Sequence, residues 1–266
     1  MKTAVSAEQI AFYQDNGFLI YPGFLDSEEV RTLKEAALQA IALMGRRKVA
    51  GAGADLIGGD AYYDRVFTQR INLWRLSDVV RDYLHRPDLG RMLCDLEGID
   101  AMRLGFDQAL IKEPFANPTT LHIDDPYWSF YSHHAISIWI ALDDATVANG
   151  CLCFLPGSHK LAGFDSVRFR DEFGALTDLY PEMRTIQPVV AEMKAGDCSF
   201  HNGLTAHGAG VNMTTGRRVA MSCSYMPDGS RFNGQQNVYP DSYFNRLQPD
   251  EILNNDEFNP LIYSRA

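Results

Sequence analysis

The N-terminal third of the chain has apolar residues at the spacing of amphipathic helices, preceded by residues that commonly start helices. Ser6 with Gln9 forms a capping-box pattern, and Gly17 is the residue type that often ends a helix. The apolar run at 18–21 then predicts a short strand. Residues 77–97 show helical spacing again, interrupted by a proline. We therefore expect helices with one short strand before residue 98.

A longer helix is predicted after Asp26, which forms a second capping-box pattern with Glu29. The apolar residues of this helix fall on one face: Val30, Leu33, Ala37, Ile41 and Met44. Gly45 ends the segment, and the basic run 46–48 follows it. Because positive charge is favourable at a helix C-terminus, we interpret this run as part of the helix cap.

From Met102 onward the apolar residues recur at every second position, which is typical of strands with one buried face. In the clearest case four apolar residues share one strand face: Ile136, Ile138, Ile140 and Leu142. Similar runs occupy 151–155, 185–193, 198–201 and 217–226. Helices followed by many short strands predict an α+β fold with a mainly β core, a barrel or sandwich carrying helices against one sheet.

Composition narrows the class of protein only moderately. With 266 residues and 46% hydrophobic residues, we expect a single domain over 1–266 with a real core. The net charge of −10 argues against a nucleic-acid partner, and no apolar run is long enough to cross a membrane. The five cysteines and the absence of a secretory signal favour free thiols and a cytoplasmic location. The charged, irregular segment 161–181 is predicted to be a lid or insertion.

Two histidines and one aspartate are the residue types that bind iron in many non-haem iron sites. His122 and Asp124 are two positions apart, so their side chains would project together from a strand. Two imidazoles and one carboxylate leave three positions of an iron open for O2 and an organic co-substrate. His207, flanked by glycine, is one candidate for the third ligand, and His201 at the end of a predicted strand is its rival.

Strand parity separates two adjacent arginines. Arg217 shares a face with Val219 and Met221, which have the character of a packed surface. Arg218 shares a face with Ala220 and Ser222, which are small enough to line a cavity. A buried guanidinium is costly unless it meets an anion, so Arg218 is the predicted partner of a carboxylate.

The chain resembles the phytanoyl-CoA dioxygenase family of Fe(II)/2-oxoglutarate-dependent oxygenases. The matching segments occur in the family's order: 12–18, 122–124, 139–145, 149–152, 155–160, 196–197 and 207–212, with Arg218 eleven positions after His207. They span nearly the whole chain. The resemblance implies a double-stranded β-helix, also called a jelly roll or cupin-like fold, with N-terminal helices packed on one sheet.

The resemblance also implies the roles of individual residues. It implies that His122, Asp124 and His207 bind the iron and that Arg218 binds the distal carboxylate of 2-oxoglutarate. Residues expected to approach the co-substrate are Gln108 and Trp139, with Arg70 as a looser match. One departure is Ala209, where relatives often carry a serine that can hydrogen-bond the co-substrate. The presence of Asp124 counts against the halogenating relatives, which replace this carboxylate.

The expected activity is hydroxylation of an unactivated C–H bond of a small molecule, with Fe(II), 2-oxoglutarate and O2 as cofactors and succinate and CO2 as products. Tyr127 and Trp128 follow the ligand pair directly and could line the substrate pocket, although packing in the core is an equal alternative. Trp74 is expected in the core. Desaturation, epimerisation or ring formation with the same cofactors is a second hypothesis, and a non-catalytic binding protein is a third. We expect a monomer or homodimer.

Overall fold

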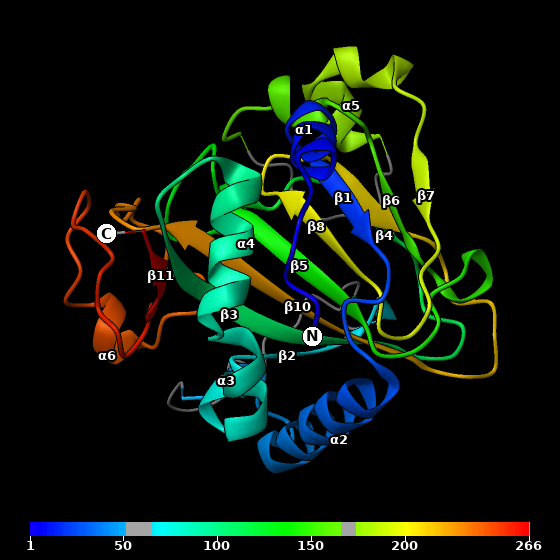
Figure 1. Cartoon of the computed structure of the whole chain (residues 1–266), viewed down its shortest axis with the longest axis horizontal. Coiled ribbons are helices and arrows are strands. Elements are labelled where there is room, and N and C mark those ends of the chain that lie inside the picture. Colours follow the sequence, from blue (N-terminus) through cyan, green and yellow to red (C-terminus); the bar gives the residue numbers. More distant parts are fainter. Residues whose placement is uncertain (52–64, 166–173, 266) are drawn as a thin grey trace.

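The computed structural model describes residues 1–51, 65–165 and 174–265. Within these residues the strands form two antiparallel sheets (Figure 1). The larger sheet has the order β1 (Phe18–Tyr21), β8 (Cys198–Asn202), β5 (Ile136–Ala141), β10 (Arg218–Pro227), β3 (Ala101–Lys112) and β11 (Leu261–Ser264), with β2 (Thr68–Ile71) also paired to β3. The smaller sheet has the order β4 (Thr119–His122), β9 (His207–Ala209), β6 (Leu152–Phe154) and β7 (Val189–Ala191).

Apolar side chains from the two sheets meet between them. Trp139 and Ala220 of the larger sheet contribute to the same buried cluster as Leu152 and Phe154 of the smaller sheet. The ring of Phe154 stacks on that of Phe18, with centroids 4.7 Å apart. Two antiparallel sheets packed face to face in this way form the predicted double-stranded β-helix.

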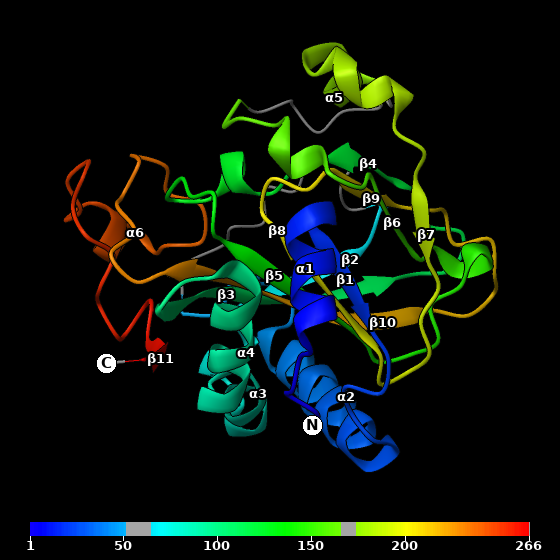
Figure 2. The same ribbon diagram turned by 45° about the horizontal axis from the view of Figure 1, so that its top comes forward.

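The N-terminal helices cover the outer face of the larger sheet, as predicted (Figure 2). The α-helices are α1 (Ala7–Asn16), α2 (Ser27–Met44), α3 (Asp78–Leu84), α4 (Pro87–Glu97), α5 (Ala175–Leu179) and α6 (Asp241–Phe244). Short 3-10 helices are η2 (Leu73–Arg75), η3 (Asp125–Tyr127), η4 (Val147–Asn149), η5 (Ser158–Lys160) and η6 (Pro181–Thr185). Among these described helices, none combines the length and the apolar character needed to cross a membrane.

The predicted helix starts and the strand faces are confirmed in detail. The Ser6 side chain accepts a hydrogen bond from the backbone N–H of Gln9, and the Gln9 side chain accepts one from the backbone N–H of Ser6. These two hydrogen bonds form the capping box. Leu33 on the apolar face of α2 joins a core cluster with Ile138 and Met221 from the larger sheet. Trp74 is buried in the same cluster. The alternation read from the sequence therefore separates the helix-covered face of the larger sheet from the face that lines the interior.

Two sequence predictions differ from the structure, and a third stays a prediction. Of the predicted strand 185–193, Val189–Ala191 forms β7 and Met193 forms an isolated bridge with Ala145, whereas Thr185 ends the 3-10 helix that begins at Pro181. In the basic run, Arg47 donates to the Leu43 carbonyl as a cap would, but Lys48 lines the central cavity instead. Of the expected lid, residues 166–173 lie outside the described part, and α5 packs through Leu176 near β4.

Candidate active site

Two histidines face each other across the short pair of strands β4 and β9. His122 and His207 are register partners, and their ring centroids are 4.2 Å apart. Each Nδ1 lies against a backbone carbonyl two residues earlier, at 2.8 Å for His122 and Thr120 and at 2.9 Å for His207 and Thr205. A carbonyl only accepts, so each Nδ1 carries the proton and the lone pair of each neutral imidazole is on Nε2.

Asp124 lies just beyond the end of β4 and not within it. Its φ of −83° and ψ of −42° are helical, so the strand parity used to pair it with His122 does not apply. The chain turns because the backbone N–H groups of Asp124 and Asp125 both donate to the Gly203 carbonyl, at 2.9 Å each. The turn nevertheless brings the carboxylate to the histidines, while Ile123 packs into a separate apolar cluster.

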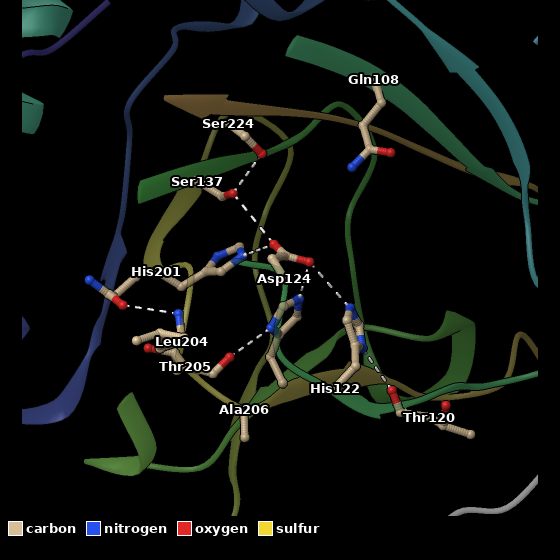
Figure 3. A network of polar contacts seen from close by, with 12 residues as sticks. Gln108, Thr120, His122, Asp124, Ser137, His201, Leu204, Thr205, Ala206 and Ser224 are labelled. Carbon is tan, nitrogen blue, oxygen red and sulfur yellow. Dashed lines mark hydrogen bonds and ion pairs between the residues drawn. The ribbon is translucent and has the colours of Figure 1, made fainter. Parts of the chain in front are cut away.

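The two oxygens of Asp124 have different neighbours. Oδ1 lies 3.5 Å from His122 Nε2 and 3.9 Å from His207 Nε2. Oδ2 lies 3.4 Å from His201 Nε2 and 3.5 Å from the Ser137 hydroxyl, which in turn contacts Ser224 (Figure 3). Oδ1 is therefore the oxygen directed to the imidazoles of His122 and His207, and Oδ2 contacts the side chains of His201 and Ser137.

His122, Asp124 and His207 fit the requirements of a metal site. Their ligand atoms lie within 4.8 Å of one another, and in the described part of the chain they are the one His/Cys/Asp/Glu group of this kind. Burial and the neighbouring His122 and His201 lower the pKa of His207 to about 3, so its imidazole is neutral at ordinary pH. Burial would raise the pKa of Asp124, but the three adjacent imidazoles hold it well below its usual range. Neutral imidazole and ionised carboxylate are the protonation states that bind a divalent metal.

His201, the rival third ligand, lies beside this group. Its ring centroid is 4.4 Å from that of His207. Its Nδ1 is buried without a hydrogen-bond partner. With Nδ1 unpartnered, the proton belongs on Nε2, where it donates to Asp124 Oδ2. The structure thus gives His201 the geometry of a residue that orients a ligand.

A cavity of about 710 Å³ opens over the three residues. Its apolar wall is made by Val49, Phe67, Ile71, Phe106, Tyr127, Trp128 and Val238. The lining also includes Trp139, Leu152, Ala209 and Arg218. A cavity of this size and character is typical of sites for small organic ligands.

The two adjacent arginines have opposite environments, as parity predicts. Arg218 is only 3% exposed and lies over the ring of Trp139, whereas Arg217 is exposed. Nε and Nη1 of Arg218 are buried without a hydrogen-bond partner, and burial lowers its pKa to about 10. A guanidinium with buried, unused donors in the lining of a cavity is suited to bind a carboxylate.

Of the other predicted site residues, four line the cavity and one does not. Gln108 and Trp139 line the cavity, and the Gln108 side chain forms a hydrogen bond with Gln69. Tyr127 and Trp128 both line it too, although Trp128 also packs with Phe130 in the core. Arg70 is absent from the cavity lining. It donates instead to the carbonyls of Gln69 and Gly45, at 2.9 and 2.8 Å.

Sequence reasoning missed several residues of the cavity wall. Lys48 follows α2, Phe67 precedes β2, and Asn237 and Val238 come from the segment after β10. None of these positions carries a local pattern that indicates a pocket, since they reach it through long-range packing. Lys48 belongs to the basic run 46–48, and the helix-cap interpretation of that run gave no reason to expect it in a cavity wall.

The fold and this arrangement of side chains define a class. Two imidazoles and one carboxylate hold an iron on one side and leave the other side open, and a buried guanidinium nearby anchors a dicarboxylate; this combination characterises the 2-oxoglutarate-dependent non-haem iron oxygenases. Within that class, residues 13–220 match the family model described as phytanoyl-CoA dioxygenase (PhyH). The chain belongs to this family.

Individual relatives support the same assignment. Dioxygenase lolE1 of Epichloe uncinata is 31% identical over 235 residues, covering 85% of each chain. The solved structure of the 2-oxoglutarate-dependent carbocyclase SnoK from nogalamycin biosynthesis superposes with a TM-score of 0.80 at 27% identity, covering 97% of this chain and 96% of SnoK. The epimerase SnoN, solved with Fe3+, 2-oxoglutarate and nogalamycin RO, gives a TM-score of 0.75 at 28% identity, covering 96% and 97%.

These comparisons confirm the predicted family, the double-stranded β-helix, and an enzyme that uses iron, 2-oxoglutarate and O2. They leave the non-catalytic hypothesis without support. The neighbours include enzymes with different reaction outcomes, so the class of enzyme is shown while the reaction catalysed by this chain is not fixed.

Proposed function

We propose that the protein hydroxylates an unactivated C–H bond of a small molecule, with 2-oxoglutarate converted to succinate and CO2. The observation that carries this proposal is a cavity of about 710 Å³ in which the His122, Asp124 and His207 group, the buried Arg218 and an apolar aromatic wall all meet. That volume exceeds what 2-oxoglutarate alone requires and leaves room for an organic substrate.

In this proposal His122, Asp124 and His207 hold the iron. The carbonyls of Thr120 and Thr205 fix both imidazoles with Nε2 unprotonated, so no proton has to leave before the metal binds. Bound iron supplies the activation of O2 that the side chains of the protein cannot perform. The contacts of Asp124 Oδ2 with His201 and Ser137 keep Oδ1 turned toward the metal position.

Arg218 is the proposed anchor for the distal carboxylate of 2-oxoglutarate. Its buried, unpartnered N–H groups supply a fixed fork that matches a carboxylate. Trp139 lies beneath the guanidinium and restricts its position, with the Arg218 Cζ 5.0 Å from the ring centroid. Gln108 lines the same cavity and is proposed to approach the co-substrate from β3.

Tyr127 and Trp128 are proposed to form part of the substrate wall. They continue an apolar surface that includes Phe67 and Phe106, which favours a largely apolar substrate. Apart from Arg218, the only cation among the described lining residues is Lys48. Since a CoA ester carries several phosphates, a free small molecule fits this lining better.

A second candidate function has specific support. SnoK is a carbocyclase and SnoN an epimerase, and both superpose over at least 96% of this chain. The same metal site, with the substrate held differently, would then give ring closure or inversion of a carbon centre in place of hydroxyl transfer.

One assay tests the function and separates the candidates. The protein is reconstituted with Fe(II) and 2-oxoglutarate, and a library of apolar small molecules is screened for succinate release above the background without substrate. Products of positive compounds are then analysed by mass spectrometry. An added oxygen atom that derives from labelled O2 supports hydroxylation. Loss of two hydrogens or an isomer of unchanged mass supports the second candidate instead, and failure of iron and 2-oxoglutarate to bind would refute both.

Ala209 offers a smaller test of the co-substrate position. It lines the cavity on β9, at the position where the family resemblance implies a serine. Ala209→Ser is expected to tighten 2-oxoglutarate binding by about 3- to 10-fold, the effect of one added hydrogen bond. The measurement is the KM for 2-oxoglutarate, with Ala206→Ser as a control at a buried position outside the cavity lining. An unchanged KM would place the co-substrate away from Ala209.

Location and assembly are also proposed. All five cysteines are unpaired, which supports a reducing, cytoplasmic environment. A monomer or homodimer is proposed, and light scattering after gel filtration would distinguish the two.

A further inference from the structure

A lysine lies directly opposite the proposed carboxylate anchor. Lys112 is the last residue of β3, and it is the register partner of Arg218 at the start of β10. Directly paired residues of adjacent strands project from the same face of a sheet. Both side chains therefore project from the interior face, at the same end of the two strands.

Lys112 is completely buried and has no partner for its charge. Its relative exposure is 0%, and its Nζ forms no hydrogen bond. Burial, and then the nearby Arg218, lower the pKa of Lys112 to about 7. An ammonium group buried without an anion is strongly unfavourable.

Few ionisable groups surround this pair of cations. Two of them raise the pKa of Arg218: Cys151, which lies just before β6, and Asp143, which lies just after β5. Burial raises the pKa of the Cys151 thiol to about 11, so it carries no charge at neutral pH. Asp143 is already engaged, because it pairs with Lys34 and accepts the Val219 N–H at 3.0 Å. In the described part of the chain the two cations thus have no carboxylate of their own.

The backbone around Lys112 leaves room for this side chain. Gly150 has a φ of +85°, and a Cβ there would lie 2.7 Å from Lys112 Cδ and 2.5 Å from the Gly210 carbonyl oxygen. A larger residue at 150 would collide with the lysine stem. The close fit fixes the stem beside Arg218 and leaves the ammonium group little freedom to reach solvent.

We propose that Lys112 is a second cation of the 2-oxoglutarate site, which acts behind Arg218 to hold the distal carboxylate. This inference rests on the proposed role of Arg218. Lys112 does not line the cavity itself, so it is a positioning residue: its charge stabilises the carboxylate together with the guanidinium that contacts it. The incoming anion supplies the charge partner that both buried cations lack.

Binding of 2-oxoglutarate is therefore coupled to a proton. In the free protein Lys112 loses its proton as the pH rises through about 7. A bound carboxylate favours the charged form and raises this pKa toward its ordinary value, so binding takes up a proton in the interval above pH 7. The affinity for 2-oxoglutarate is expected to fall as the pH rises through this interval, by up to about tenfold per pH unit.

Calorimetric titration tests the inference without turnover. The protein is loaded with Mn(II) and titrated with 2-oxoglutarate in two buffers of different ionisation enthalpy, which reports the protons taken up. Wild type is expected to take up a fraction of a proton at pH 8, and Lys112→Met to take up none. At pH 7 the variant is expected to bind 2-oxoglutarate about 10- to 100-fold more weakly, the range for one charge-assisted interaction.

Two controls separate this role from a structural one. 2-Oxobutanoate, which lacks the distal carboxylate, is expected to bind wild type and Lys112→Met equally. Lys160→Met removes a lysine that pairs with Asp15 on the surface, and it should behave as wild type. Equal weakening for both ligands, or an unchanged Kd for 2-oxoglutarate, would overturn the proposal.

The remaining outcomes are also decisive. If Lys112→Met does not fold, proton uptake by wild type decides alone, and its absence would contradict the coupling. If wild type binds 2-oxoglutarate without proton uptake and the variant is normal, only this inference fails. If wild type binds no 2-oxoglutarate, the proposed function fails with it.

Discussion

Replacement of His207 by alanine is expected to abolish Fe(II) binding and reduce succinate formation to the background without enzyme. His207 Nε2 is one of three ligand atoms within 4.8 Å, and its removal leaves one imidazole and one carboxylate. Two ligands do not hold iron in the geometry that this chemistry needs. Iron content after anaerobic reconstitution and succinate release in the presence of 2-oxoglutarate are the two measurements.

His201→Ala is the matched control for this prediction. His201 also reaches Asp124, but through the oxygen on the far side from His122 and His207. Its loss is expected to weaken metal binding by about 10- to 100-fold without abolishing it, which is usual for residues that orient a ligand. If His201→Ala lost the metal and His207→Ala kept it, the assignment of the third ligand would be wrong.

Arg218→Met is expected to raise the Kd for 2-oxoglutarate by about 30- to 5000-fold. The substitution leaves the carboxylate in a buried site without its guanidinium, and loss of one partner from a buried charged pair costs about 2–5 kcal/mol. Metal binding should persist, because Arg218 is not among the metal-ligand candidates. Titration of the Mn(II)-loaded protein with 2-oxoglutarate gives the Kd.

The adjacent arginine provides the control. Arg217 is exposed, so Arg217→Met is expected to leave the Kd unchanged within about twofold. Equal effects of the two substitutions would mean that general electrostatic attraction, and not a buried contact, binds the dicarboxylate.

The residues on long regular elements were predictable from the sequence. β10 runs without interruption from Arg218 into the core, so the alternation of large and small residues identified which arginine faces inward. The apolar stripe of α2 and the capping boxes at Ser6 and Asp26 depend on neighbours within four positions, and the structure has all of them. Local patterns suffice where local geometry is regular.

The remaining features depend on contacts between distant segments. Asp124 reaches the histidines through a turn held by Gly203, and no periodicity in its own segment encodes that turn. The residues alone left His201 and His207 as alternatives, and in the structure both histidines do reach Asp124. The burial of Lys112 depends on Gly150, which is remote in the chain.

The register of β4 against β9 has a consequence for the folding of the smaller sheet. These strands have four and three residues, and His122 and His207 are opposite one another in the pair. A slip of one residue would turn one imidazole to the opposite side of the sheet. A metal ion that requires both rings can bind only the correct alignment, so iron would act as a template that selects the native pairing of two short, weakly specified strands.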